Sequence, residues 1–437
     1  MSFSSLNLDA RLLSGLTAAG YDQPTPIQSA AIPALLAGKD VMAGAQTGTG
    51  KTAAFALPIL HRLLDIREQN PLASDEVQPL RALVLVPTRE LAQQVYKSFV
   101  KYSDESGLTC AIAYGGISIN PQIDALSDGV DVLVATPGRL LDLMHKQAVS
   151  LSQLQFLVFD EADRMLDMGF IIDIQRILKH VPSARQTMLF SATFNEEIFT
   201  LSKNILKDPE LIEVDARNTT ASKVEQMVYV VDEDKKRELT SFMIGSKNWK
   251  QVLIFVRTKQ GADALAKEMC KDGIKTQSIH GDKSQGARER ALEEFKEGKV
   301  RALVATDVAA RGLDIQQLQY VINYELPYIA EDYIHRIGRT GRAGLEGLAV
   351  SLMSMGEEYL LEEIEAVLDD RVPQSWYPGY EPDLTKPVVK NKKNSRSAQK
   401  SRQKDRAYGI KTGNKSSSNK GANNGGGDRS GGRNRRS

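Results

Sequence analysis

The sequence has few of the features that mark secreted, membrane or zinc-binding proteins. Its two cysteines, Cys110 and Cys270, lie far apart with neither a CxxC spacing nor a histidine cluster beside them, which argues against a disulfide framework and a zinc site. We expect both to be buried structural thiols in a reducing compartment. Residues 1–6 lack a secretory leader pattern, and no apolar run approaches the ~20 residues of a membrane span. A cytoplasmic protein without membrane association is therefore predicted.

Charge is nearly balanced overall but unevenly distributed along the 437 residues. The formal net charge is +1, yet residues 371–437 carry 17 Lys or Arg against 4 Asp or Glu, a charge of +13. Residues 1–370 are correspondingly acidic at −12. Apolar periodicity fades from about residue 373, and Ser, Asn, Gly, Lys and Arg dominate. This composition cannot bury enough apolar surface to fold, so residues 371–437 are predicted to be a basic, disordered tail.

Short apolar runs alternate with helical patterns in two blocks of the chain. Such near-continuous apolar runs indicate parallel strands covered on both faces. The runs are residues 82–86, 130–134, 156–159, 187–190, 252–256, 301–305, 320–323 and 348–352. A polar stretch separates the blocks. The sequence therefore predicts an α/β protein with one lobe over residues 1–208, a linker over 209–222 and a second lobe over 223–370.

Polar segments follow several of these strands directly. They include residues 87–90, 136–139, 160–163, 191–193 and 306–307. Because the carboxyl ends of strands form the binding crevice of an open parallel sheet, we expect these segments to face ligands.

Residues 45–52 have the pattern of a phosphate-binding loop. They read Ala-Gln-Thr-Gly-Thr-Gly-Lys-Thr, after a short strand and before a helical pattern. Glycines allow backbone N–H groups to surround phosphate, Lys51 can reach the outer phosphates, and Thr52 can bind Mg²⁺. Ala45 replaces the usual first glycine. A glycine-rich turn is the alternative, and the Gly-Lys-Thr ending favours the loop.

The acidic segment at residues 160–163, Asp-Glu-Ala-Asp, suits the same chemistry. One carboxylate can hold Mg²⁺, and its neighbour can polarise an attacking water. Alone, such a segment is usually a solvated helix start. Its place after a strand, with a phosphate loop upstream, indicates a nucleoside triphosphatase.

With these residues in view, residues 3–368 resemble the DEAD-box family of ATP-dependent RNA helicases. Residues 20–28 match its adenine-recognition motif, with the isolated aromatic Phe3 upstream, and residues 335–342 match its arginine-rich motif. Ala45 agrees with the family's own version of the loop. The resemblance implies two tandem RecA-like parallel-sheet domains and an RNA-stimulated ATPase that uses ATP and Mg²⁺.

Several ATP-site roles follow from this resemblance. Gln28 is expected to pair with the adenine edge, and Phe3 to stack on the ring. The implied ATP-binding residues are Phe3, Tyr21, Gln28, Ala45, Gln46, Thr47, Gly48, Thr49, Gly50, Lys51, Thr52 and Asp314. Mg²⁺ is expected on Thr52 and Asp160, partly through water. The implied catalytic residues are Lys51, Asp160, Glu161, His335, Arg339 and Arg342, the last two as arginine fingers.

The same resemblance implies RNA contacts in both lobes, made to phosphate and sugar with little base specificity. The residues are Pro87, Thr88, Arg89, Gly115, Gly116, Thr136, Pro137, Gly138, Arg139, Arg257, Thr258, Gln285, Arg288, Thr306 and Asp307. Asp163, Ser191, Ala192 and Thr193 are expected to couple hydrolysis to lobe closure. Each small or hydroxyl residue could also be an ordinary turn residue, Gly115 and Gly116 especially.

Residues 217–219 and 378–383 resemble the bacterial RhlE type within the family. That likeness implies a role in ribosome assembly or RNA turnover, with ribosomal precursors or RNA-decay proteins as partners. A monomer is expected separately, although the sequence does not determine the oligomeric state. Two alternatives stay open: an ATP-gated RNA clamp or annealing factor, and a translocating DNA helicase.

Overall fold

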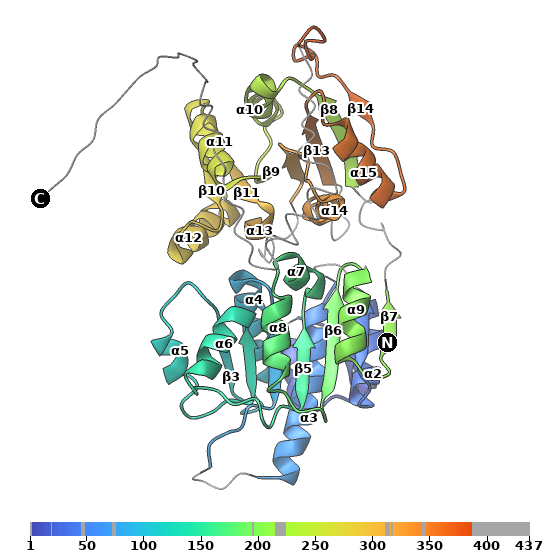
Figure 1. Ribbon diagram of the computed structural model, residues 1–437, viewed down its shortest axis with the longest axis vertical. Helices are drawn as coiled ribbons and strands as arrows, with labels where there is room; N and C mark the ends of the chain where they lie inside the picture. Colours follow the sequence, from blue (N-terminus) through green and yellow to red (C-terminus); the bar gives the residue numbers. More distant parts are fainter. Residues whose placement is uncertain are drawn as a thin grey trace, which may run out of the picture.

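The computed structural model describes residues 2–18, 20–44, 49–71, 76–194, 196–214, 224–310, 315, 318–341 and 347–386. These residues form two α/β lobes, stacked one above the other in Figure 1. Each lobe is built on a seven-stranded sheet whose neighbouring strands all pair in parallel. The prediction of two tandem parallel-sheet domains is confirmed, and each run predicted as a strand forms one.

The first lobe has the strand order β3-β4-β2-β5-β6-β1-β7. Its strands are β1 (Val41–Gly44), β2 (Ala82–Leu85), β3 (Cys110–Ala113), β4 (Val132–Ala135), β5 (Phe156–Phe159), β6 (Gln186–Ser191) and β7 (Glu210–Glu213). Its helices are η1 (Phe3–Leu6), α1 (Ala10–Ala18), α2 (Pro26–Leu36), α3 (Lys51–Gln69), α4 (Arg89–Ser103), α5 (Asn120–Asp124), α6 (Pro137–His145), α7 (Ala162–Asp167), α8 (Ile171–Leu178) and α9 (Glu196–Ile205). Two separate apolar clusters place α1 to α4 on one face of the sheet and α6 to α9 on the other.

The second lobe has the matching order β10-β11-β9-β12-β13-β8-β14. Its strands are β8 (Val224–Val230), β9 (Val252–Val256), β10 (Thr276–Ile279), β11 (Ala302–Thr306), β12 (Tyr320–Asn323), β13 (Gly347–Met353) and β14 (Gln374–Ser375). Its helices are η3 (Glu233–Lys235), α10 (Lys236–Ser246), α11 (Lys259–Lys271), α12 (Gln285–Lys296), α13 (Asp307–Ala310), α14 (Ala330–Ile337) and α15 (Glu358–Leu368). Helices α10 and α11 cover one face, and α12 to α15 the other. No helix in the described part of this chain is long and apolar enough to cross a bilayer.

The boundaries predicted for the linker and the tail need correction. Strand β7 lies inside the predicted linker 209–222, but it pairs with β1 and so belongs to the first sheet. Residues 371–386, assigned to the tail, pack on the second lobe. There β14 pairs with β8, Tyr377 contacts the ring of Tyr229, and Lys386 forms an ion pair with Asp232 at 2.8 Å. These 16 residues are formally neutral, so the whole charge of +13 lies in residues 387–437, outside the described residues.

The expectation of two buried thiols is wrong. Cys110 is half-buried in β3, and Cys270 is exposed near the end of α11. Burial raises the pKa of the Cys110 thiol to about 12, so it stays protonated.

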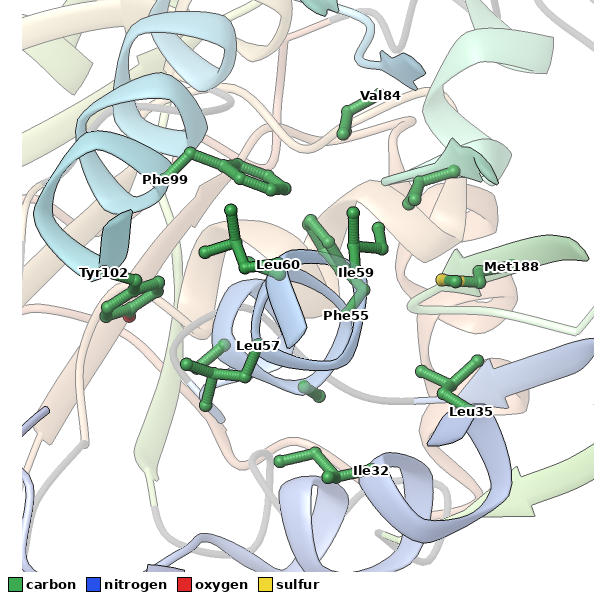
Figure 2. Packing of buried hydrophobic residues seen from close by; sticks show 14 of the residues in the cluster. Ile32, Leu35, Phe55, Leu57, Ile59, Leu60, Val84, Phe99, Tyr102 and Met188 are labelled. Atoms are coloured by element: carbon green, nitrogen blue, oxygen red, sulfur yellow. The ribbon is translucent and has the colours of Figure 1, made fainter. Parts of the chain in front are cut away.

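Helix α3 runs through the centre of the first lobe's larger apolar cluster (Figure 2). Phe55 is fully buried there, with its ring centroid 5.2 Å from that of Phe190 and 6.2 Å from that of Phe99. Since α3 also begins at Lys51, the packing of this helix fixes the position of the predicted phosphate site.

We predict that Phe55→Ala destabilises the first lobe by about 3–5 kcal/mol, because truncating a buried aromatic leaves a cavity. Both tryptophans, Trp249 and Trp376, lie in the second lobe. Urea unfolding followed by far-UV circular dichroism should therefore show an earlier first-lobe transition, while the tryptophan fluorescence transition stays in place. The control Phe199→Ala, at a 40% exposed position, should cost about 1 kcal/mol or less. Equal losses for the two variants would contradict this account of the core.

Candidate functional site

The start of α3 brings a buried lysine to the carboxyl end of β1. Gly50 precedes the helix with a φ of 91°, a left-handed conformation that glycine adopts without strain. Lys51 is buried, and its Nζ has no hydrogen-bond partner among the described residues. Backbone N–H groups at a helix N-terminus favour an anion, so this position suits phosphate. Residues 45–48, the remainder of the predicted loop, lie outside the described residues.

Gln28 joins the predicted adenine motif to the phosphate loop. Its Oε1 accepts a hydrogen bond from the backbone N–H of Thr25 at 2.9 Å, and its Nε2 donates to the carbonyl of Gly50 at 3.0 Å. A Cβ on Gly50 would lie only 2.4 Å from Nε2. A glutamine amide has two donor hydrogens and two acceptor lone pairs, so one of each remains for a base edge.

The two aromatic residues of this motif have different surroundings. Phe3 is buried in the apolar cluster that includes Ile27, next to the residue that carries the predicted base contact. Tyr21 is exposed, and the Lys101 ammonium lies 5.3 Å from the centre of its ring.

Asp160 and Glu161 follow β5 and are both buried. Burial raises the pKa of Asp160 to about 6, although the nearby Lys51 ammonium acts to lower it. Glu161 has a φ of 53°, a conformation that costs a non-glycine residue roughly 1–2 kcal/mol. The surrounding structure must compensate for this strain to keep the carboxyl group at the start of α7.

The arrangement fits a phosphate ligand with a hard cation. Asp160 Oδ1 and Glu161 Oε2, like Lys51 Nζ, are buried without hydrogen-bond partners among the described residues. Buried charged groups are normally satisfied, so such a group of atoms indicates a place for an external ligand. The structure shows no cluster of three or more metal-binding side chains within its described ranges. Mg²⁺ bound here would therefore take most of its ligands from phosphate and water, as Mg²⁺ commonly does.

Asp163 connects α7 to the end of β6. Its Oδ2 accepts hydrogen bonds from the backbone N–H and the hydroxyl of Thr193, at 3.2 and 3.1 Å. Ser191 in turn donates its hydroxyl to the carbonyl of Thr193 at 2.7 Å. The acidic segment and the residues predicted to couple hydrolysis to closure are thus joined directly.

Helix α14 of the second lobe faces α7 across the junction between the lobes, as Figure 1 shows. His335 and Arg339 line a small cavity together with Asp332 and Asp307. Arg336 is fully buried and donates to both carboxylate oxygens of Asp307, at 2.6 and 2.8 Å. This bidentate pair anchors α14 to the end of β11. Arg342 and Asp314, the other predicted second-lobe residues of the ATP site, lie outside the described residues.

Many of the predicted RNA residues lie at the N-termini of helices. Thr88 caps α4, Thr136 precedes α6, Thr258 caps α11, and Gln285 begins α12. Exposed N–H groups at helix N-termini are suited to phosphate oxygens.

Arg89 and Arg139 lie close to one loop of the first lobe. Gly116 has a φ of 83°, and a Cβ there would lie 2.2 Å from the Arg89 guanidinium carbon. Arg139 is buried and donates to the carbonyl of Ile117 at 2.8 Å. A Cβ on Gly115 would meet no atom within 4 Å. The close approach of Arg89 therefore requires glycine at position 116 but not at 115.

Three residues predicted to contact RNA have protein partners for their charged groups in this structure. Arg257 donates to the Leu326 carbonyl at 2.7 Å and to Glu357 at 2.5 Å. The Asp307 carboxylate is bound by Arg336, as described above. Arg288 crosses between the lobes to Glu90, at 2.7 Å. These contacts give the three side chains structural roles that the sequence did not suggest.

The sequence-based interpretation missed the buried contact between Arg164 of α7 and Asp332 of α14, with Nη1 and Oδ1 3.2 Å apart. The only signal in the sequence was that each lies beside a named motif: Arg164 directly follows the acidic segment, and Asp332 lies three residues before His335.

Comparisons with known proteins agree with this geometry. The DEAD/DEAH box helicase model matches residues 25–201, and the helicase conserved C-terminal domain model matches residues 234–344. The ATP-dependent RNA helicase RhlB of Xanthomonas oryzae pv. oryzae is 42% identical over 376 residues, which cover 85% of this chain and 65% of that protein. The chain thus spans less than two thirds of that relative's length. ATP-dependent RNA helicase CshA of Listeria monocytogenes is 42% identical over 370 residues, covering 85% of this chain and 69% of that protein.

A solved structure extends the similarity to both lobes. S. cerevisiae Dbp5 bound to RNA and ADP BeF3 has a TM-score of 0.75 and 31% identity, and the match covers 87% of this chain and 95% of that chain. By the matching models, the identity to CshA and this shared fold, the chain belongs to the DEAD-box family of RNA helicases.

Proposed function

We propose that this chain is an ATP-dependent RNA helicase that separates RNA duplexes locally when its lobes close on ATP and single-stranded RNA. The observation that carries the proposal is the buried, unpartnered set of charged atoms on Lys51, Asp160 and Glu161 at the junction between the lobes. RNA is the expected nucleic acid because the chain is similar to RNA helicases, including Dbp5 bound to RNA.

In this proposal the first lobe binds ATP and prepares the attacking water. Lys51 contacts the outer phosphates, Thr52 and Asp160 hold Mg²⁺, and Glu161 accepts a proton from the water. Bound Mg²⁺ would neutralise charge on the phosphate oxygens. The remaining donor and acceptor of Gln28 would select adenine, and Phe3 and Tyr21 would complete the base site.

The second lobe would complete the catalytic site from across the junction. Arg339 and Arg342 would stabilise charge on the transferred phosphoryl group, and His335 would help to order the water. Asp314 would contact the ribose. Because these groups come from the other lobe, hydrolysis would depend on closure. Asp163 and residues 191–193 of the first lobe would couple hydrolysis to this closure.

RNA would lie along the helix N-termini of both lobes, held by phosphate and sugar contacts.

This proposal also includes the RhlE-type assignment, a role in ribosome assembly or RNA turnover, a cytoplasmic location and a monomeric state. They rest on the composition of the chain and on residues 217–219 and 378–383, of which the first segment lies outside the described residues.

The deciding experiment measures ATP hydrolysis with RNA, with DNA and with neither, alongside the separation of a short RNA duplex. RNA-stimulated hydrolysis with duplex separation is expected. RNA-stimulated hydrolysis without separation would favour the clamp or annealing alternative, and equal stimulation by DNA would contradict RNA specificity.

We predict that Glu161→Gln keeps ATP and RNA binding but lowers kcat by two or more orders of magnitude, because it removes the proposed base and leaves Asp160 in place. The variant should stay trapped on RNA in the presence of ATP. Single-turnover hydrolysis and RNA co-sedimentation measure the two effects. Hydrolysis within a few-fold of wild type would show that another group activates the water.

The neighbouring glycines give a matched test of the RNA site. Gly116→Ala should weaken RNA binding roughly tenfold or more, because a Cβ at this left-handed position would displace the Arg89 guanidinium. Gly115→Ala should have a smaller effect, since a Cβ there meets no protein atom within 4 Å and leaves Arg89 in place. Fluorescence anisotropy with labelled RNA measures both, and a nucleotide-binding assay should show unchanged ATP affinity. Equal RNA affinities for the two variants would contradict the proposed role of Arg89.

The structure also refines where the basic tail should be cut. Deleting residues 387–437 removes the whole charge of +13 and leaves the docked residues 371–386 in place. RNA affinity should fall, and its salt dependence should flatten by about 0.7 log units per log unit of salt for each lost phosphate contact. The value of kcat at saturating RNA should change little. An unchanged salt slope would support a tail that does not bind RNA.

A further inference from the structure

The ion pair between Arg164 and Asp332 is nearly hidden from water although it joins two different lobes. The two side chains are 4% and 9% exposed, and Nη1 and Oδ1 lie 3.2 Å apart. Each side chain would be more accessible if the lobes separated. In this arrangement of the lobes both charges are withdrawn from water and paired with each other.

Arg164 is directly connected to the acidic segment. It lies in α7, three residues after Glu161, and its backbone N–H donates to Asp163 Oδ1 at 3.0 Å. Asp163 in turn holds Thr193. The Arg164 side chain is thus carried by the same short helix, α7, that Glu161 precedes as its N-cap.

Asp332 lines the same cavity as the predicted arginine finger Arg339. It lies in the first turn of α14, where a carboxylate is favoured by the helix dipole. His335 is one turn further on, and Asp332, His335 and Arg339 line the same cavity. Since the bidentate bonds of Arg336 to Asp307 fix α14 to its own sheet, Asp332 moves with the second lobe as a rigid unit.

We propose that Arg164 and Asp332 are positioning residues that form a latch, which closes the lobes and sets Arg339 opposite Glu161. This inference rests on the proposed function, because it assumes that the closed state is the one that hydrolyses ATP. The physical reason is that a lone buried charge is costly, whereas a paired charge, or none, is tolerated. Closure is therefore favourable only when the lobes are aligned so that Arg164 meets Asp332.

The test compares Arg164→Gln, Asp332→Asn and the double variant in the full chain. Closure is measured by resonance energy transfer between two dyes, one on the exposed Cys270 of the second lobe and one on a cysteine introduced at exposed Lys146 of the first lobe. Cys110→Ser prevents a third label. Closure is titrated with single-stranded RNA in the presence of a non-hydrolysable ATP analogue. ATP hydrolysis is measured over the same RNA concentrations.

Each single variant should raise the RNA concentration for half-maximal closure roughly tenfold or more, because it buries an unpaired charge. The double variant should return to within a few-fold of wild type, a non-additivity expected only of residues that interact. The RNA concentration for half-maximal hydrolysis should change in parallel, with a smaller change in kcat. Arg164→Lys, which keeps the charge, should be less impaired than Arg164→Gln.

Arg176→Gln is the matched control. Arg176 pairs with Asp173 at 3.8 Å within α8, and its side chain is 62% exposed, so its loss should not affect closure. Circular dichroism of every variant checks that it is folded.

Two results would overturn the latch while leaving the proposed function intact. One is wild-type closure by both single variants, and the other is an additive loss in the double variant. A wild-type chain that fails to close or to hydrolyse ATP with RNA would instead overturn the proposed function, and the latch with it.

Discussion

The uniform direction of the strands is the constraint on which the rest of the structure depends. In a parallel sheet all carboxyl ends meet at one edge, so the residues after each strand are collected there whatever their separation in the chain. In the first lobe this brings Lys51, Asp160 and Thr193 together from β1, β5 and β6. The second lobe repeats the strand order and presents α14 to the same junction. Neither sheet edge alone holds both the acidic segment and the arginines.

Several charged groups at this junction are buried, and most of the arginines among them are stabilised by carboxylate partners. Arg336 is satisfied within its own lobe by Asp307, whereas Arg164 and Arg288 find their carboxylates, Asp332 and Glu90, in the other lobe. Lys51, Asp160 and Glu161 retain buried atoms without partners among the described residues. Because unpaired buried charge is unfavourable, ligand binding and lobe closure would each satisfy a different part of the same site.

At each of the two predicted binding surfaces, a glycine lets the backbone approach a predicted ligand-binding side chain closely. Gly50 lies against the amide of Gln28, and Gly116 lies against the guanidinium of Arg89. In each case the side chain that would recognise a ligand packs where a Cβ would otherwise be. At the far edge of the second sheet, β14 pairs with β8, and residues up to Lys386 stay on this lobe. Lys386, the last described residue, is therefore held on the second lobe.

The sequence by itself determined the fold class, the more apolar strands and the identity of the chemical groups, because apolar periodicity and motif spacing are local properties of the chain. It also indicated the family, through residues such as Lys51, Glu161 and Arg339. It did not assign β3, β7, β10 or β14, which are the edge strands of the two sheets, or β8, which lies beside β14. The pairing of such strands depends on neighbours that are distant in the chain. Nor could the sequence reveal that Arg257 and Arg288 bind carboxylates, or that Arg164 meets Asp332 168 residues away. Only the tertiary structure decided these contacts, because the partner of a charged side chain is set by how the lobes pack and not by its neighbours in sequence.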